Sequence, residues 1–179
     1  MINASDFEGM KFETLGITGK WKALLGDVSL PFTMMSYGKP GHGKSTFNIM
    51  LAHYFASEFD KKVLYIAKEE GAGYTLHDKF KRLKAFHTNI FISSKLPDKL
   101  GGYDFVFIDS VNEMNMEPDD LRKLLQDNPG ISWAYIFKTT KDGRFRGSQD
   151  FEHLVDVSVR IENGKAYTEK GRFGGSSEI

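Results

Sequence analysis

The stretch that most constrains the fold is GKPGHGKST, residues 38–46, which has the spacing Gly-x-x-x-x-Gly-Lys-Ser of a phosphate-binding loop. It follows an apolar run, residues 32–37, that is typical of a buried strand. Apolar residues then recur at helical spacing, which predicts a helix that starts near Gly43 and ends before Asp60. A strand, a glycine-rich loop and a helix in this order are the context that a nucleotide-binding P-loop requires.

The rest of the chain alternates apolar runs with helical patterns. Strands are expected at residues 62–67, 89–93, 103–110 and 132–137, and helices at residues 76–86 and from Pro118 onward. Near the C-terminus, apolar and polar residues alternate on both sides of Asn163-Gly164, a dipeptide that favours a hairpin turn. We therefore expect an α/β fold: a mostly parallel central sheet with helices on both faces and a C-terminal antiparallel hairpin.

The domain organisation follows from length and continuity. The 179 residues suffice for one domain with a single core, and no linker interrupts them, so residues 1–179 are expected to form one domain. Residues 1–20 carry scattered apolar side chains, which is consistent with docking either on the core or on a neighbouring subunit.

Composition excludes several classes of protein. The chain has no cysteine, so it can form neither a disulfide framework nor a thiolate zinc site. It shows no apolar run near 18 residues and no secretory signal pattern, so we expect no membrane association and a cytoplasmic location. With 24 basic and 24 acidic side chains, it does not resemble a uniformly basic nucleic-acid coat protein. One segment is nevertheless rich in basic residues: it holds Lys138, Lys141, Arg144 and Arg146. This segment could form a local basic groove, or it could be an ordinary solvated loop.

The P-loop residues have distinct expected roles toward ATP and Mg²⁺. Lys44 would neutralise the β- and γ-phosphates, Ser45 would offer its hydroxyl to Mg²⁺, and Thr46 would support the α-phosphate. His42 occupies a variable position and is interpreted as a spacer. The expected nucleotide-binding set is Gly38, Lys39, Pro40, Gly41, His42, Gly43, Lys44, Ser45 and Thr46.

Acidic residues end two of the expected strands. Asp109 ends the strand at residues 103–110, as a Walker B acid does, and would hold Mg²⁺ together with Ser45. Glu69 and Glu70 follow the strand after the P-loop helix, where RecA-like ATPases keep the base that activates water. Glu69 is the better candidate because it comes first after the strand, although two solvated surface acids would have the same pattern.

A pair of cations lies just past the terminal hairpin. Lys170 and Arg172 are two positions apart, so on a strand they would face the same way. They would then reach a γ-phosphate bound by a neighbouring subunit, or they are simply a surface charge pair.

Several segments resemble the ATPase core of the RadA (Sms) proteins in the RecA/DnaB superfamily. The segment WKALLGDVSLPFTMMSYGKPGHGKST resembles the lead-in to Walker A, and VLYIAKEEGAGYTLHDKFKRL resembles the catalytic-glutamate strand and its helix. FVFIDSVNEM is similar to the Walker B strand, and TKDGRFRGSQDFEHLVDVSVRIEN to the family's threonine-lysine-acid-glycine segment. KGRFGGSSEI resembles the lysine-asparagine-arginine-phenylalanine-glycine signature of RadA.

The resemblance implies site residues and partners. It makes Glu69 the catalytic base and Lys170 and Arg172 fingers that act on the neighbouring subunit's nucleotide, and it places a sensor and a DNA-facing loop at residues 138–147. On this basis Lys141, Arg144 and Arg146 are candidate DNA contacts. The family forms ring-shaped hexamers that use ATP to move along single-stranded DNA in recombination and repair.

The sequence also departs from the RadA pattern. RadA proteins carry a four-cysteine zinc module and a Lon-like C-terminal domain, and this sequence is expected to represent the core without either. Gly171 replaces the signature asparagine, Lys138 replaces a histidine, and Arg146 replaces a small residue.

Three functions are compatible with these features. The first is a Mg²⁺-dependent ATPase that acts on single-stranded DNA in recombination, repair or replication, as a homo-oligomeric ring or filament. The second is an ATP-dependent assembly or regulatory module that binds protein rather than DNA, which the neutral charge favours. A small-molecule P-loop kinase is the third, and it is disfavoured because no helical insertion resembles a lid.

Overall fold

The structure, a computed structural model, describes residues 2–11, 14–140, 144–171 and 175–179. The described helices are α1 (Ala4–Glu8), α2 (Gly19–Leu25), α3 (Lys44–Phe59), α4 (Tyr74–Arg82), α5 (Val111–Met114), α6 (Pro118–Asp127) and α7 (Asp150–His153). The described strands are β1 (Thr33–Tyr37), β2 (Val63–Ala67), β3 (Ile90–Ser93), β4 (Phe105–Asp109), β5 (Ser132–Phe137), β6 (Val157–Glu162), β7 (Lys165–Lys170) and β8 (Ser176–Glu178).

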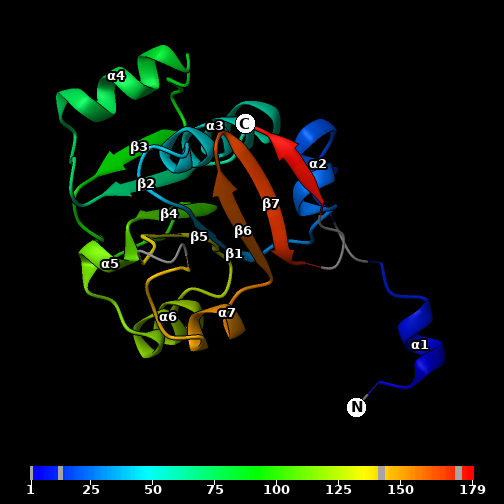
Figure 1. Ribbon diagram of the computed structural model, residues 1–179. Coiled ribbons are helices and arrows are strands. Elements are labelled where there is room, and N and C mark those ends of the chain that lie inside the picture. The colour runs from blue at the N-terminus through cyan, green and yellow to red at the C-terminus, as the bar shows by residue number, and fades with distance from the viewer. Residues whose placement is uncertain (1, 12–13, 141–143, 172–174) are drawn as a thin grey trace.

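Within the described residues, these strands form one sheet in the order β3-β2-β4-β5-β1-β6-β7-β8 (Figure 1). The six strands from β3 to β6 in this order are parallel, and β7 and β8 continue the sheet as antiparallel neighbours. The turn between β6 and β7 contains Asn163 and Gly164, both at positive φ, as a tight hairpin turn requires. The expected α/β fold with a mostly parallel sheet and a C-terminal hairpin is therefore confirmed.

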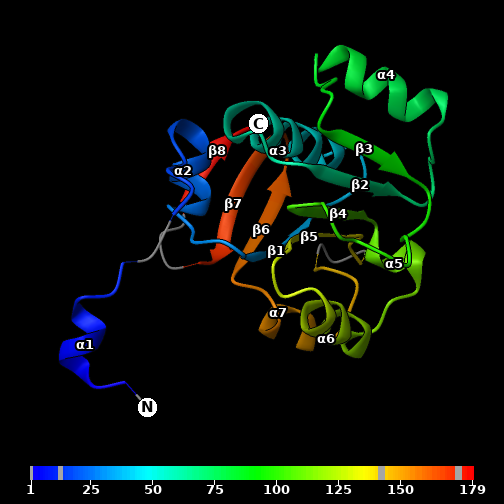
Figure 2. The ribbon, with the colours of Figure 1, turned by 180° about the vertical axis from the view of Figure 1, so that it is seen from behind.

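Helices cover both faces of the sheet (Figures 1 and 2). Successive side chains of a strand point to opposite faces, so a strand buried on both sides is apolar throughout. In β4, Phe105 and Phe107 pack with α3 and α4, whereas Val106 and Ile108 pack with α5 and α6. This double burial explains why the parallel strands appear in the sequence as uninterrupted apolar runs.

The boundaries of the expected elements hold closely, with one difference at α4. The pattern predicts a helix over residues 76–86, but the helix begins at Tyr74 and ends at Arg82. Lys84 lies at φ +52°, a left-handed conformation that cannot continue a right-handed helix. Leu76, Phe80 and Leu83 carry the helical period, and Leu83 is the C-cap, so the period ends at the helix boundary, although Phe86 still stacks on Phe80.

The N-terminal segment is set apart from this core. Residues 2–11 are exposed throughout, and α1 contributes no buried residue. Both views place α1 away from the sheet (Figures 1 and 2). Whether this segment docks on a neighbouring subunit stays a prediction. Of the helices in the described ranges, none has both the length and the apolar character needed to cross a membrane.

Candidate nucleotide-binding site

The carboxyl ends of the parallel strands bring the P-loop, Asp109 and the Glu69-Glu70 pair to one edge of the sheet, as expected for ligand sites in open α/β sheets. The P-loop connects β1 to α3 and passes very close to β6. A Cβ built on Gly38 would lie 2.2 Å from the carbonyl oxygen of Ile161, so only glycine fits there. Gly43 precedes α3 at φ +103°, which again favours glycine. The loop can therefore present backbone N–H groups and the N-terminus of α3 to an anion.

Lys44, the first residue of α3, lies back over the loop. Its Nζ atom donates hydrogen bonds to the carbonyl oxygens of Gly38, at 2.7 Å, and Lys39, at 3.1 Å. Burial lowers its pKa; the carboxylate of Asp109 opposes this shift, and the nearby charges of Lys138 and Lys79 add to it. Three lysines thus converge on the region that phosphates would occupy.

A buried amide fixes α3 to β1 directly behind the loop. Asn48 is fully buried, and its Nδ2 donates to Ser36 Oγ at 2.9 Å and to the carbonyl oxygen of Lys44 at 2.9 Å. Ser36 is also buried, so each partner satisfies a polar group that would otherwise be desolvated and unpaired. This contact sets the position of the first helical turn relative to the strand.

Asp109 is the last residue of β4, and α3 packs against one face of this strand. The hydroxyl of Tyr65, on the neighbouring strand β2, donates to Asp109 Oδ2 at 3.0 Å. Burial raises the pKa of Asp109, whereas the Tyr65 hydrogen bond and the charges of Lys79 and Lys44 act to lower it. The carboxylate therefore lies in a largely dry environment that favours a bound cation.

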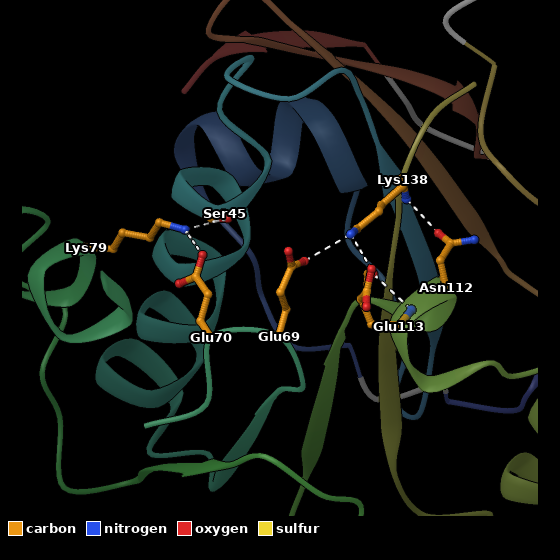
Figure 3. A network of polar contacts seen from close by, with 8 residues as sticks. Ser45, Glu69, Glu70, Lys79, Asn112, Glu113 and Lys138 are labelled. Carbon is orange, nitrogen blue, oxygen red and sulfur yellow. Dashed lines mark hydrogen bonds and ion pairs between the residues drawn. The ribbon is translucent and has the colours of Figure 1, made fainter. Parts of the chain in front are cut away.

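Glu69 is linked to the end of β5 through an ion pair (Figure 3). Lys138 Nζ lies 3.0 Å from Glu69 Oε2, and it also pairs with Glu113 Oε1 of α5. Asn112 accepts a hydrogen bond from the backbone N–H of Lys138 at 2.8 Å, which fixes this part of the chain. The hydrogen bonds to Glu113 and Glu69 raise the pKa of Lys138. The candidate base is thus held at the edge by a cation that it shares with a second carboxylate.

Glu70 takes a different partner from its neighbour Glu69 (Figure 3). Its Oε1 atom pairs with Lys79 Nζ on α4, and Lys79 Nζ also lies 3.4 Å from Ser45 Oγ. The Glu70 side chain is 30% exposed and that of Glu69 is 65% exposed, so Glu70 is the more enclosed carboxylate. Both acids nevertheless reach the edge that carries the P-loop.

Ser45 and Asp109 fit the donor set for Mg²⁺, which prefers hydroxyl, carboxylate and water oxygens. They come from the two elements that bound the P-loop edge, and the carboxylate of Asp109 is buried there. Among the residues that the structure describes, no cluster of three or more His, Asp or Glu side chains is arranged to hold a metal. Nucleotide phosphates and water would therefore supply the remaining ligands.

His42, which the sequence analysis interprets as a spacer, connects the P-loop to the β6–β7 turn. Its carbonyl oxygen accepts from the backbone N–H of Gly164 at 3.1 Å, and its Nδ1 accepts from that of Asn163 at 3.2 Å. The position thus has a structural contact in addition to its place in the loop.

Lys170 lies at the opposite edge of the sheet from the P-loop. It pairs with Ser158 near the start of β6, and its Nζ donates to the carbonyl oxygens of Glu152, at 2.6 Å, and Val155, at 2.5 Å. It therefore cannot reach the P-loop of its own chain from this position. Arg172, the other expected finger, is outside the described residues.

The candidate DNA-contacting segment follows β5. Arg144 and Arg146 are exposed, and Lys141 is outside the described residues. The backbone folds back here, because Arg146 N–H donates to the carbonyl oxygen of Lys138 at 2.6 Å. This contact places Arg146 beside Lys138 at the end of β5.

Sequence reasoning missed three residues of this edge: Lys79, Asn48 and Glu113. Each acts through a partner distant in the chain or hidden by packing, and no motif or spacing marks any of them. The packing of α4 in the same core cluster as α3 brings Lys79 to Ser45.

Comparison with known proteins supports the assignment of this chain as a RadA-like ATPase core. Residues 30–123 match the profile of a family described as an AAA domain. The chain is 28% identical to the DNA repair protein RadA of Mycolicibacterium smegmatis, with 79% of this chain and 37% of RadA covered. It is 29% identical to the DNA repair protein RadA of Campylobacter jejuni, with the same coverage. The chain thus spans little more than a third of the length of these relatives, and the resemblance to the RadA core is confirmed.

A solved structure has a similar fold. The crystal structure of a KaiC-like protein from the hyperthermophilic archaeon Pyrococcus horikoshii superposes with a TM-score of 0.64 and 17% identity. The superposition covers 94% of this chain and 93% of that protein. At this identity the similarity concerns the fold, which is of the RecA type.

Proposed function

The chain belongs to the AAA domain family, and from this membership we propose that it is a Mg²⁺-dependent ATPase that acts on single-stranded DNA as a homo-oligomeric ring or filament. The observation that carries the proposal is the meeting of the P-loop, Asp109, Glu69 and Glu70 at one edge of the sheet. The RadA relatives support the link to DNA, since their name describes DNA repair.

In this mechanism the P-loop amides and Lys44 bind the phosphates of ATP. Lys44 exchanges its two loop carbonyl contacts for phosphate oxygens. Glu69 orients a water molecule and accepts its proton as the water oxygen attacks the γ-phosphorus. The bond between that phosphorus and the bridging oxygen breaks, and the products are ADP and phosphate. Bound Mg²⁺ would neutralise charge on the phosphates.

The proposed oligomer would bring the candidate fingers Lys170 and Arg172 of one chain to the nucleotide of its neighbour. Lys170 is at the far edge from its own P-loop, so a head-to-tail neighbour is the route by which Lys170 and Arg172 would reach a γ-phosphate. An arginine finger accelerates hydrolysis by roughly 10³- to 10⁵-fold, so a dilute monomer should turn over slowly.

The experiment combines ATP hydrolysis, mass and DNA binding in the same samples. Phosphate release is measured with and without single-stranded DNA, mass by light scattering, and binding by fluorescence anisotropy from low to moderate salt. The proposal predicts oligomers, DNA-stimulated hydrolysis and binding that weakens steeply with salt, because phosphate contacts release counterions. If DNA changes neither the rate of phosphate release nor the fluorescence anisotropy even at low salt, the proposed action on DNA is wrong. The function would then be that of a regulatory module that binds protein.

A further inference from the structure

Lys79 places an ammonium beside one of the expected metal ligands, Ser45. Its Nζ is 3.4 Å from Ser45 Oγ and paired with Glu70 Oε1, and its side chain extends from α4 toward the first turn of α3 (Figure 3). The side chains of Lys79 and Glu70 are 24% and 30% exposed, so water screens their charges less than it screens an ordinary surface pair.

The groups around this ammonium are oxygen donors. The second carboxylate oxygen of Glu70 is buried and has no hydrogen-bond partner in the described part of the chain. Burial raises the pKa of Asp109, and the charge of Lys79 opposes this rise more strongly than the charge of Lys44 does. The Ser45 hydroxyl and the Glu70 carboxylate thus contact one ammonium, which acts on Asp109 through its charge, and these oxygen donors are the ligand types that Mg²⁺ prefers.

We propose that the Lys79 ammonium is a resident substitute for the metal, which neutralises Glu70 and Asp109 in the nucleotide-free chain and must leave Ser45 when Mg²⁺ arrives. Lys79 is then a positioning residue that keeps the carboxylates at the edge before the nucleotide binds. The inference rests on the proposed function for the identity of the nucleotide and the metal.

The physical reason is competition between like charges. An ammonium and a divalent cation within a few ångström repel each other, and in a partly buried site this repulsion is not fully screened. Without either cation, the enclosed carboxylate of Glu70 would lose its ion-pair partner, and Asp109 would keep only the Tyr65 hydrogen bond and the charge of Lys44, which destabilises the empty site. Lys79 therefore stabilises the empty site and weakens its affinity for Mg²⁺.

The test compares Lys79→Met with two matched variants. Lys79→Arg retains the positive charge, and Lys81→Met removes an exposed lysine from the same helix. Two quantities are measured at constant ionic strength: the melting temperature of nucleotide-free protein against Mg²⁺ concentration, and the Mg²⁺ concentration that gives half-maximal binding of a fluorescent ADP analogue. Neither readout depends on turnover.

We expect Lys79→Met to melt at a lower temperature without Mg²⁺ and to gain more from Mg²⁺ than the wild type. We expect its half-saturating Mg²⁺ concentration to fall by about threefold or more, since one nearby positive charge is lost. Lys79→Arg and Lys81→Met should behave as the wild type. An unchanged Mg²⁺ dependence in Lys79→Met overturns the inference, as does loss of ADP binding at saturating Mg²⁺, which would make Lys79 a phosphate ligand. If the wild type binds no nucleotide at all, the proposed function fails instead.

Discussion

The Nζ atom of Lys138, at the end of β5, lies 3.0 Å from Oε2 of Glu69, just past the end of β2. The strand between them in the sheet is β4, so the ion pair crosses the edge where Asp109 ends its strand. The same ammonium pairs with Glu113, and the three side chains form one charged group. This arrangement makes the orientation of the candidate base dependent on Lys138.

Replacing Lys138 with methionine should therefore lower kcat while nucleotide binding persists. We expect a decrease of about ten- to a hundredfold, because small misplacements of a reacting group slow catalysis by such factors. Phosphate release at saturating ATP and binding of a fluorescent nucleotide measure the two quantities. Lys123→Met, an exposed position on α6, is the matched control. Equal kcat in both variants would show that Lys138 does not position Glu69.

Introducing a side chain at Gly38 should disrupt the P-loop. The added Cβ of Gly38→Ala would meet the Ile161 carbonyl oxygen at 2.2 Å, and neither backbone can yield without moving β1 or β6. We expect a loss of about 1–3 kcal/mol in the free energy of unfolding, in the range typical of overpacking. Denaturant unfolding gives the value, and Gly101→Ala is the control because its Cβ would meet no atom within 4 Å. Wild-type stability in Gly38→Ala would contradict the close approach.

The Ser36–Asn48 pair should behave as one unit. Ser36→Ala and Asn48→Ala each leave a buried polar partner unsatisfied, so each should lower the free energy of unfolding by about 1–3 kcal/mol. The double variant should lose less than the sum of the two, since the second change removes an orphaned group. Strictly additive losses would mean that the two side chains act independently.

The fold could be anticipated further than the site. The apolar runs that became β1, β2, β4 and β5 are buried on both faces, so period and length alone indicated them, and Asn163-Gly164 marked the hairpin. The short helices α2, α5 and α7 were not predicted, because each is too short to show a clear helical period of apolar residues.

For the candidate site, the positions of the P-loop, Asp109 and the Glu69-Glu70 pair at one edge of the sheet were predictable, because each lies at or just past the end of an apolar strand; their roles stay predictions. Lys79 was not predictable, because its contact with Ser45 depends on how α4 packs beside α3 in the folded chain. Glu113 and Asn48 likewise act through packing that no local pattern encodes. The roles assigned to Lys170 and Arg172 stay predictions.

Acidification should weaken the fold through His53 on α3. Burial lowers its pKa below the ordinary 6.5; His87 adds to this shift and Glu58 opposes it. Below that ordinary value the unfolded chain binds more protons than the folded chain, so stability is lost as the pH falls through this window. The melting temperature of His53→Gln should therefore fall less between pH 7 and pH 5 than that of the wild type. The exposed His153→Gln serves as the control, and identical pH dependence in His53→Gln and the wild type would contradict this account.

The proposed trans arrangement can be tested by mixing two inactive variants. Arg172→Ala keeps the base Glu69, and Glu69→Gln keeps the finger, so a mixed oligomer contains some complete sites. We expect each variant alone to bind ATP and hydrolyse it slowly, and the mixture to recover part of the wild-type phosphate release. A mixture no more active than its components would rule out a finger supplied by the neighbouring subunit.

The most direct test of the central claim is phosphate release from ATP by the wild type and by Glu69→Gln, with Mg²⁺ and single-stranded DNA present. The exposed variant Glu58→Gln, near the far end of α3 from the P-loop, is the matched control. We predict hydrolysis that increases with DNA in the wild type and in Glu58→Gln, and a decrease of about 10²- to 10⁴-fold in Glu69→Gln, as loss of a general base produces. The central claim would be contradicted if the wild type bound ATP and assembled on DNA without releasing phosphate. Equal rates of phosphate release in Glu69→Gln and Glu58→Gln would also contradict it.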